Sequence, residues 1–202
     1  VVYPHGGPFV RDAPGYDPMV QFLASRGYAV LQVNYRGSPG YGEAFYRAGW
    51  KEVGHAIQND ITDGVKAMIA GGLANPKRIA IFGGSYGGYS ALWALENTPQ
   101  LYRCGISLAG VTDWYAVLGE NHKSIRLGEH VTGADEAYRV LSKTIGDPAT
   151  DEVSLKAISP LYHADQIKAP VFIIQGTEDR TVPEEQATRF IAALKEQGVP
   201  YE

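Results

Sequence analysis

The 202-residue sequence predicts a single α/β domain, in which a mostly parallel sheet carries helices on both faces. Short apolar runs alternate with segments of helical periodicity, which is the order of strand–helix–strand units. The apolar runs are nearly continuous, as in strands that are buried on both faces of a parallel sheet. Glycine is abundant, with 24 residues, which indicates many tight turns and close backbone approaches.

Five apolar runs are candidate strands of this sheet. They are rich in Val, Ile, Leu and Tyr, and several end at a glycine that marks a turn. We expect parallel pairing, because the helical segments between the runs supply right-handed crossovers. The runs are Val1–Tyr3, Tyr28–Asn34, Arg78–Phe82, Cys104–Ala109 and Val171–Gln175.

Helical periodicity marks the segments between these runs. The last helix is expected to start after Pro183 and to stop near Gly198, since these residue types are typical of helix boundaries. The stretch 119–162 contains no clear strand and is interpreted as helical insertions and loops. The other helical segments are 57–69, Met19–Ser25 and Gly88–Glu96.

The composition is that of an ordinary globular protein, and it excludes several classes of function. The formal net charge is −4 without a cluster of Lys or Arg, so we expect no nucleic-acid partner. The sequence has no run of about 18 uncharged apolar residues, so we expect no membrane span. No zinc-type spacing of Cys and His occurs, and we expect no metal site.

The two ends of the chain predict a fragment. The chain opens inside a candidate strand without an initiating Met, and it stops at Val199–Glu202, where another strand is expected. We therefore expect residues 1–202 to be one domain, truncated at both ends, of a longer protein. The start gives no information on targeting. The single cysteine, Cys104, is expected to be a small buried side chain, and it favours a cytoplasmic location.

The strongest motif is Gly83–Gly87, which has the form Gly-x-Ser-x-Gly with Ser85 at its centre. It follows a candidate strand and precedes a helical segment, which is the context of a nucleophile elbow in an α/β-hydrolase fold. Such a turn holds the serine in a strained conformation with its hydroxyl exposed, and the glycines let strand and helix approach closely. We expect Ser85 to be a nucleophile and the Tyr86 N–H to be an oxyanion donor.

A second segment with a role in this chemistry is His5–Pro8, which follows the first candidate strand. Hydrolases of this kind take another oxyanion N–H from such a loop, because glycines present an amide without a side chain in the way. We favour the Gly7 N–H as this donor. Without Ser85 elsewhere in the chain, the segment would be interpreted as a simple turn.

The candidate acid lies in Gly176–Pro183, directly after the last candidate strand. Catalytic groups of open α/β sheets gather at the carboxyl ends of strands. Asp179 comes after Ser85, as a Ser–Asp–His order requires, and its expected role is to orient a histidine. Glu178 is the rival acid, and a solvated loop carboxylate is the alternative for both.

The histidine of such a triad is missing from its expected position. The required order places it after Asp179, whereas all five histidines precede that residue. We assign none of them as the general base, and we expect the base to lie beyond residue 202. The five are His5, His55, His122, His130 and His163.

Together these motifs resemble the catalytic domain of the prolyl oligopeptidase family of serine peptidases, and most closely its acylaminoacyl-peptidase and dipeptidyl-peptidase branch. The combination is much more specific than Gly-x-Ser-x-Gly alone, and it runs along nearly the whole chain. The matching segments are His5–Pro8, Asn34–Gly42, Asn59–Asp60, Gly83–Tyr89, Gly110–Trp114, Ser159–Pro160 and Gly176–Pro183.

The resemblance implies an α/β-hydrolase fold, an upstream β-propeller domain in the full-length protein, and hydrolysis of short peptides near their N-terminus without a cofactor. It implies that Ser85 is the nucleophile and Asp179 the triad acid. It also implies that mostly apolar side chains bind the substrate beside the nucleophile. These are Tyr86, Val111, Trp114 and Val182.

Two residues depart from the family pattern. His5 stands where the oligopeptidase branch has a tyrosine whose hydroxyl serves the oxyanion hole, which is a further reason to prefer the Gly7 amide. Gln175 stands where many members carry a histidine, and this difference is expected to affect structure rather than chemistry.

Three side chains near these motifs have structural alternatives. Tyr89 is expected to pack in the core. Trp114 fits a pocket wall and a core position equally well. We expect Arg36 to form an ion pair with a helix carboxylate such as Asp60, which would fix the loop behind the site.

The leading functional interpretation is a serine peptidase domain that forms an acyl-enzyme on Ser85. A carboxylesterase-like hydrolase is an alternative, because the same triad cleaves esters. A catalytically incomplete fragment is another, because the triad histidine is absent from the 202 residues.

Overall fold

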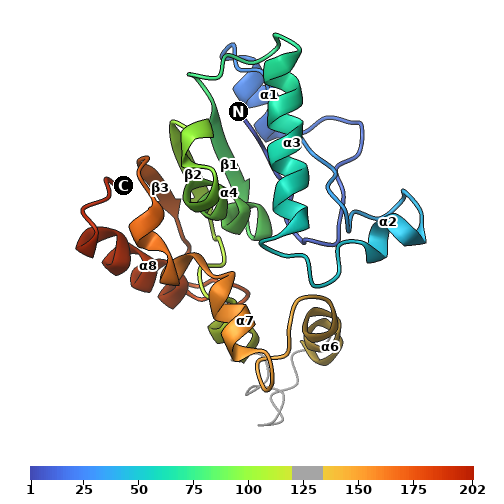
Figure 1. Ribbon diagram of the computed structural model, residues 1–202, viewed down its shortest axis with the longest axis vertical. Helices are drawn as coiled ribbons and strands as arrows, with labels where there is room; N and C mark the ends of the chain where they lie inside the picture. Colours follow the sequence, from blue (N-terminus) through green and yellow to red (C-terminus); the bar gives the residue numbers. More distant parts are fainter. Residues whose placement is uncertain (120–133) are drawn as a thin grey trace.

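The computed structural model describes residues 1–119 and 134–202. Within these residues, a three-stranded parallel sheet has the order β1 (Ala80–Gly84), β2 (Cys104–Leu108) and β3 (Val171–Ile174). Figure 1 shows helices around this sheet, with α6 and α7 at one end of the molecule. The three strands lie where the sequence predicts them, with small shifts at their ends.

The helices also follow the predicted order, and the described part of 119–162 contains helices and loops but no strand. No helix in 1–119 or 134–202 combines the length and the apolar character that a bilayer span requires. The labelled helices are α1 (Pro18–Ala24), α2 (Glu43–Arg47), α3 (Ala56–Ala70), α4 (Tyr86–Asn97), α6 (Ala134–Thr144), α7 (Glu152–Ala157) and α8 (Glu184–Glu196), with 3-10 turns η1 (Pro99–Leu101), η2 (Pro160–Tyr162) and η3 (Ala164–Gln166). Residues 114–119 are helical as well.

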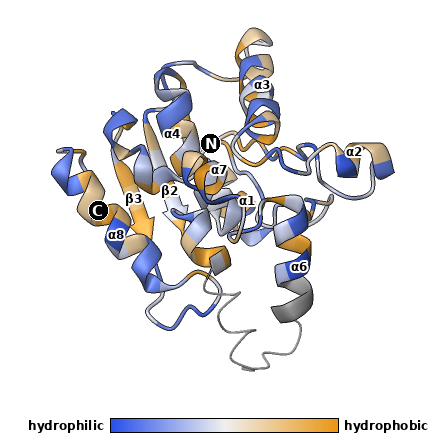
Figure 2. Cartoon of the chain, turned by 60° about the horizontal axis from the view of Figure 1, so that its bottom comes forward, coloured by the Kyte–Doolittle hydropathy of each residue, from blue (hydrophilic) through white to orange (hydrophobic). Residues whose placement is uncertain are grey.

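The parallel register explains which strand residues are buried. Ile81 pairs with Gly105 on the face that α4 covers, and a Cβ at Gly105 would press against Leu95 of that helix. Side chains alternate along a strand, so Phe172 and Ile174 point to the other face, where they are 42% and 39% exposed. Figure 2 shows β3 as a hydrophobic strand beside α8. The register brings the carboxyl ends of the three strands side by side.

One predicted strand is wrong. Tyr28–Asn34 forms no regular strand, and Leu31 makes an isolated parallel bridge with Val2. The physical reason is the short partner: the chain leads into the loop His5–Pro8 soon after Tyr3, so only Leu31 is paired, through the Val1 carbonyl oxygen and the Tyr3 N–H. Tyr28 is 54% exposed, so this end of the segment lies at the surface. The predicted strand Val1–Tyr3 is likewise reduced to bridges.

Helix α4 is the buried centre of the domain. All of its residues from Tyr86 to Glu96 are buried, as in a helix surrounded by protein. The Tyr89 ring packs against Trp93 and Trp114, so the prediction of a core residue is confirmed. The Trp93 Nε1–H donates to the Gly54 carbonyl oxygen at 2.8 Å, which ties α4 to the loop before α3.

The predicted pair between Arg36 and Asp60 of α3 is confirmed. Arg36 Nε donates to one carboxylate oxygen of Asp60 at 2.8 Å, and Arg36 Nη2 donates to the other at 2.7 Å. The Arg36 backbone N–H donates to the same carboxylate at 2.9 Å. This bidentate arrangement fixes both the side chain and the backbone of the loop that follows Tyr35.

The prediction that Cys104 is buried is wrong. Cys104 is partly exposed at the first position of β2. It shares a strand face with Ile106, which pairs with the exposed Phe172. The cysteine therefore belongs to the face of the sheet opposite α4, and the apolar sequence around it gave no sign of this asymmetry.

Glu96 is a buried carboxyl group at the end of α4. It is 3% exposed, and neither of its carboxyl oxygens has a hydrogen-bond partner among the described residues. Burial, with a smaller contribution from the charge of Asp165, raises the pKa of Glu96 well above its ordinary value. The folded protein therefore holds a proton on Glu96 at pH values where the unfolded chain has released it.

This proton makes stability depend on pH. The contribution of Glu96 is fully present below its unfolded pKa of about 4.5 and is lost as the pH rises toward the folded pKa, at up to about 1.4 kcal/mol per pH unit. Glu96→Gln removes the ionisation while keeping the shape of the side chain. We expect the free energy of unfolding of the variant, relative to that of the wild type, to be higher at pH 8 than at pH 5. The measurement is urea unfolding of the full-length protein at both pH values, followed by tryptophan fluorescence. An equal difference at both pH values would contradict this assignment.

Candidate active site

Ser85 lies at the junction between β1 and α4. Its backbone has φ 55° and ψ −121°, a conformation that non-glycine residues rarely adopt and that costs about 1–3 kcal/mol. Ser85 is exposed, although Gly83 before it and Tyr86 after it are buried. The predicted elbow is therefore present, and the strained turn lifts one hydroxyl out of an otherwise buried junction.

The glycines of the motif are required by close packing. A Cβ at Gly83 would overlap the backbone of Gly87, and a Cβ at Gly87 would overlap the carbonyl oxygen of Pro4. A Cβ at Gly88 would lie 2.9 Å from the Cα of Gly110. Strand β1, helix α4 and the first loop thus approach one another at distances that exclude side chains, which explains the spacing of these glycines.

The loop His5–Pro8 lies against Ser85. A Cβ built on Gly6 would be 3.8 Å from the Ser85 Cβ, and Gly7 has a φ of 116° that favours glycine. The loop that follows the Val1–Tyr3 segment thus lies beside the candidate nucleophile, as predicted. Tyr86, the first residue of α4, has an N–H without an acceptor inside the helix, as every first helical residue does.

His5 holds this loop from behind. Its ring is buried and stacks on Tyr35 at a centroid distance of 4.1 Å. Nε2 lies 3.0 Å from the Ser38 hydroxyl, and Nδ1 lies 2.7 Å from the Gly6 carbonyl oxygen and 2.9 Å from the Tyr35 hydroxyl. Burial lowers the pKa of His5. The sequence motif Asn34–Gly42 contained Tyr35 and Ser38, but their support of the loop depends on this fold and was not predicted.

The four predicted substrate-binding side chains are buried beside the elbow. The Tyr86 ring lies 5.7 Å from the Tyr35 ring and 6.2 Å from the Trp114 ring, as centroid distances. For Trp114, which is 3% exposed, this packing supports the core alternative. Val111 and Val182 are 4% and 3% exposed.

Asp179 lies in the loop after β3 with its carboxylate organised by backbone amides. Oδ1 accepts hydrogen bonds from the N–H groups of Thr181 and Val182, both at 2.9 Å. Oδ2 makes no hydrogen bond within the described residues. Asp179 is partly buried and Glu178 is exposed. Gln175 donates from Nε2 to the Val182 carbonyl oxygen at 2.8 Å, which supports its predicted structural role.

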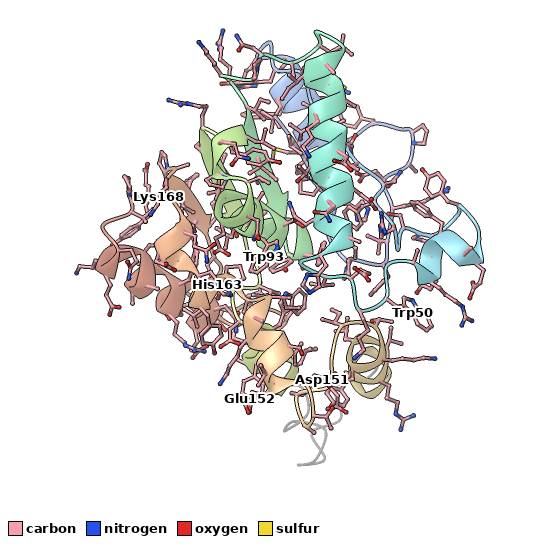
Figure 3. All side chains as sticks on the ribbon, in the orientation of Figure 1. Trp50, Trp93, Asp151, Glu152, His163 and Lys168 are labelled. Carbon is pink, nitrogen blue, oxygen red and sulfur yellow. The ribbon has the colours of Figure 1, made fainter. Side chains whose placement is uncertain are left out.

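The described histidines have other partners. Both ring nitrogens of His5 are engaged behind the loop, and His55 is exposed at the start of α3. His163 Nε2 lies 3.0 Å from the Ala157 carbonyl oxygen, and its ring meets the Trp93 ring edge-on at a centroid distance of 5.6 Å. Figure 3 shows His163 and Trp93 near each other between α4 and α7. His122 and His130 lie outside the described residues.

The three site segments meet at one edge of the sheet. The Ser85 N–H donates to the Leu108 carbonyl oxygen at 2.8 Å, and the Ala109 N–H donates to the Ile174 carbonyl oxygen at 2.8 Å. These bonds connect the ends of β1, β2 and β3 in order, so the elbow, the 109–114 turn and the Asp179 loop are neighbours. The edge can therefore present a serine, backbone donors and a carboxylate together.

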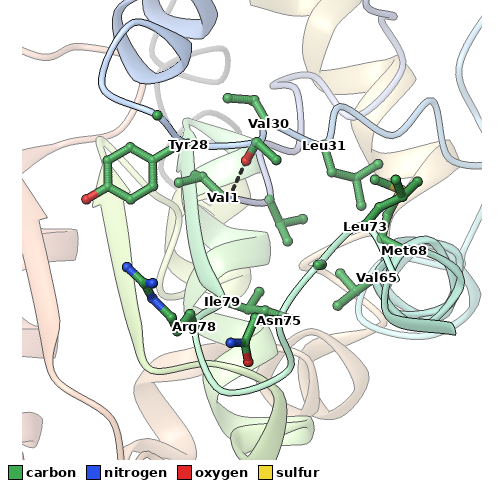
Figure 4. A pocket seen from close by; sticks show the side chains of 14 residues that line it. Val1, Tyr28, Val30, Leu31, Val65, Met68, Leu73, Asn75, Arg78 and Ile79 are labelled. Atoms are coloured by element: carbon green, nitrogen blue, oxygen red, sulfur yellow. Dashed lines mark hydrogen bonds between the residues drawn. The ribbon is translucent and has the colours of Figure 1, made fainter. Parts of the chain in front are cut away.

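A cavity of about 240 Å³ lies at the other end of β1, where the strand begins. Figure 4 shows Tyr28, Met68 and Leu73 on its walls, with Arg78 as its charged group. It contains none of the predicted site residues. Within the described residues, no group of three or more His, Cys, Asp and Glu side chains is arranged to hold a metal ion.

Comparison with known proteins agrees with this geometry. Over 99% of its length, the chain is 39% identical to dipeptidyl peptidase family member 6 of Caenorhabditis elegans, of which it covers 26%. A puromycin-hydrolyzing peptidase of Mycobacterium tuberculosis superposes with a TM-score of 0.87 at 33% identity, over 99% of this chain and 28% of that one. Pyrococcus horikoshii acylaminoacyl peptidase superposes with a TM-score of 0.85 at 31% identity, over 99% and 31%.

These solved structures share the parallel sheet and the helices of this chain, so the predicted α/β-hydrolase fold is confirmed. The chain spans between a quarter and a third of the length of these proteins. The family model described as "Prolyl oligopeptidase family" matches residues 14–202, which is most of the chain. On this match, the chain belongs to the prolyl oligopeptidase family.

Proposed function

We propose that this chain is the catalytic part of a serine peptidase, with Ser85 as its nucleophile. The observation that carries the proposal is the exposed Ser85 at φ 55°, held between buried residues at the carboxyl edge of the sheet. The family to which the chain belongs supports the same assignment. Asp179 is the proposed acid, because its Oδ2 is left open by a loop that fixes Oδ1.

The proposed reaction forms an acyl-enzyme. The Ser85 oxygen attacks the scissile carbonyl carbon while its proton passes to a histidine supplied by the longer protein, beyond residue 202. The N–H groups of Tyr86 and Gly7 stabilise the negative charge that develops on the carbonyl oxygen. The C–N bond then breaks, the amine leaves with the proton, and water releases the acyl group by the same steps in reverse. Asp179 keeps the histidine ring oriented.

The proposed substrates are short peptides that are cleaved near their N-terminus. The relatives named dipeptidyl peptidase and acylaminoacyl peptidase support this class. We propose that the P1 side chain contacts the side chains beside the elbow, and that a β-propeller in the full-length protein limits access. Tyr86, Val111, Trp114 and Val182 are buried in this structure. The proposal therefore requires that these side chains move apart when the P1 side chain binds.

A comparison of amide and ester substrates tests this proposal against a carboxylesterase. We expect the full-length protein to cleave at least one aminoacyl or N-acyl-aminoacyl anilide with kcat/KM above about 10⁴ M⁻¹ s⁻¹. The panel should contain free and acylated N-termini beside a p-nitrophenyl ester, with phosphonate-inhibited enzyme as the control. Hydrolysis of the ester with background rates on every anilide would favour the esterase, and background rates on both would favour an inactive domain.

A further inference from the structure

The turn after β2 takes its hydrogen-bond acceptors from distant side chains. The N–H groups of Thr112 and Asp113 both donate to Oε1 of Gln186, at 2.9 and 2.8 Å. The next N–H, that of Trp114, donates to Oγ of Ser159 at 2.8 Å. Three consecutive backbone amides in a buried turn therefore depend on two side chains, one of which belongs to α8.

Gln186 is buried against this turn. It is 3% exposed, and the Thr112 hydroxyl donates to its backbone carbonyl oxygen at 2.7 Å. A buried amide that loses its acceptor retains the full cost of its desolvation. Because a single oxygen of Gln186 serves two amides, removing that oxygen leaves both without a partner and frees the turn to move.

Asp113 adds a charged connection between the same elements. Its side chain is 2% exposed, and Oδ2 accepts hydrogen bonds from Arg189 Nη1 and from the Tyr162 hydroxyl, both at 3.0 Å. Oδ1 accepts from the Ala116 N–H at 3.1 Å and so caps the helical segment 114–119. The Arg189 side chain is 48% exposed, so solvent screens this pair and its effect is smaller than that of Gln186.

These contacts connect two parts of the candidate active site. The turn begins with Val111 and ends with Trp114, whose ring packs against Tyr86 next to the nucleophile. Helix α8 begins directly after the loop that carries Asp179 and Val182. Gln186 and Arg189 therefore connect the turn that carries Val111 and Trp114 to the helix that follows Val182.

Resting on the proposed function, we propose that Gln186 and Arg189 are positioning residues that set the selection of the substrate's P1 side chain. Among the described residues they make no hydrogen bond to Ser85 or Asp179. Gln186 acts through the backbone N–H groups of Thr112 and Asp113, and Arg189 acts through the Asp113 carboxylate. Their loss changes the shape of the P1 region while the nucleophile and the acid loop keep their geometry.

The test compares P1 selection with the reactivity of the nucleophile in the full-length protein. Gln186→Met and Arg189→Met remove the acceptor and the charge, and Gln197→Met and Lys195→Met are matched changes at exposed positions at the C-terminal end of α8, away from the turn. For each variant, kcat/KM is measured on an anilide panel whose P1 residue ranges from Ala to Phe. The rate of Ser85 labelling by a fluorophosphonate without a P1 side chain is measured in parallel.

We expect Gln186→Met to reduce the largest kcat/KM ratio in the panel by about tenfold, the size of effect that small changes in an apolar pocket produce. Arg189→Met should reduce it by about twofold to fivefold. Labelling rates should stay within about twofold of the wild type, which is under about 0.5 kcal/mol in the barrier. Both controls should match the wild type in all measurements.

Unchanged ratios in both variants, even with a lowered melting temperature, would show that the contacts serve stability alone and would overturn the proposal. A fall in the rate of Ser85 labelling together with a fall in the kcat/KM ratio would overturn the proposal too, because the substitution would then act on the catalytic triad. If Gln186→Met does not fold, the ratio in Arg189→Met decides. Failure of the proposed function is distinct, since the wild type would then show no labelling at Ser85 and no P1 preference to lose.

Discussion

Ser85→Ala in the full-length protein should lower kcat by about 10⁶-fold, because the hydroxyl that forms the acyl-enzyme is gone. The fold should remain, since alanine fits the exposed position and keeps the backbone that β1 and α4 impose. The measurement is steady-state hydrolysis of the best anilide substrate, with circular dichroism as the check on folding. Ser25→Ala, at an exposed serine after α1, is the matched control and should retain the wild-type rate.

A rate near that of the wild type in Ser85→Ala would show that the exposed serine is not the nucleophile. Unfolding of the variant would be a different result, and circular dichroism separates the two. The check on folding by circular dichroism is necessary because Ser85 has a strained φ of 55°, which the surrounding packing must maintain.

Asp179→Asn should lower kcat by about 10⁴-fold, as replacement of a triad acid by its amide favours the wrong tautomer of the histidine. The loop should keep its shape, because the asparagine Oδ1 still accepts the N–H groups of Thr181 and Val182. Glu178→Gln is the matched control, since it makes the same change one residue earlier on an exposed side chain. It should alter the rate by less than about tenfold.

The pH dependence of kcat/KM separates the two roles of a carboxylate in this loop. An acid that orients a histidine changes the rate at every pH at which that histidine is neutral, whereas a solvated carboxylate leaves the profile unchanged. A severe loss in Glu178→Gln with a mild effect in Asp179→Asn would move the triad acid by one residue. It would also require the loop to turn from the conformation in which Asp179 Oδ1 accepts two amides.

The strands of the sheet and the elbow could be predicted, because each depends on a local sequence pattern. Runs such as Val171–Gln175 predict strands because they are apolar, although burial on both faces is wrong for this run, since Phe172 and Ile174 are 42% and 39% exposed. The Gly-x-Ser-x-Gly spacing predicts the elbow because only glycine permits the approach of β1 and α4. Tyr28–Asn34 is equally apolar, yet its partner segment offers only Val1 and Tyr3, so Leu31 alone is paired.

The contacts that support the site could not be predicted from the sequence. Gln186 accepts from an amide 74 residues earlier in the chain, and Tyr35 reaches His5 across 30 residues. A single sequence carries no pattern for such pairs, because each depends on how two elements pack. Trp114 shows the same limit, since its apolar ring suits a pocket and a core equally until the neighbouring Tyr86 and Tyr89 rings are placed.

The central claim, that Ser85 is the nucleophile, is tested most directly by mapping a covalent adduct. The full-length protein is treated with a fluorophosphonate at a pH where the triad histidine is neutral, digested, and analysed by tandem mass spectrometry. We expect one stoichiometric adduct on Ser85, formed at the same rate as hydrolysis is lost, and about 10⁴-fold slower labelling in Asp179→Asn. A stoichiometric adduct on any other residue, or full inactivation with Ser85 unmodified, would contradict it.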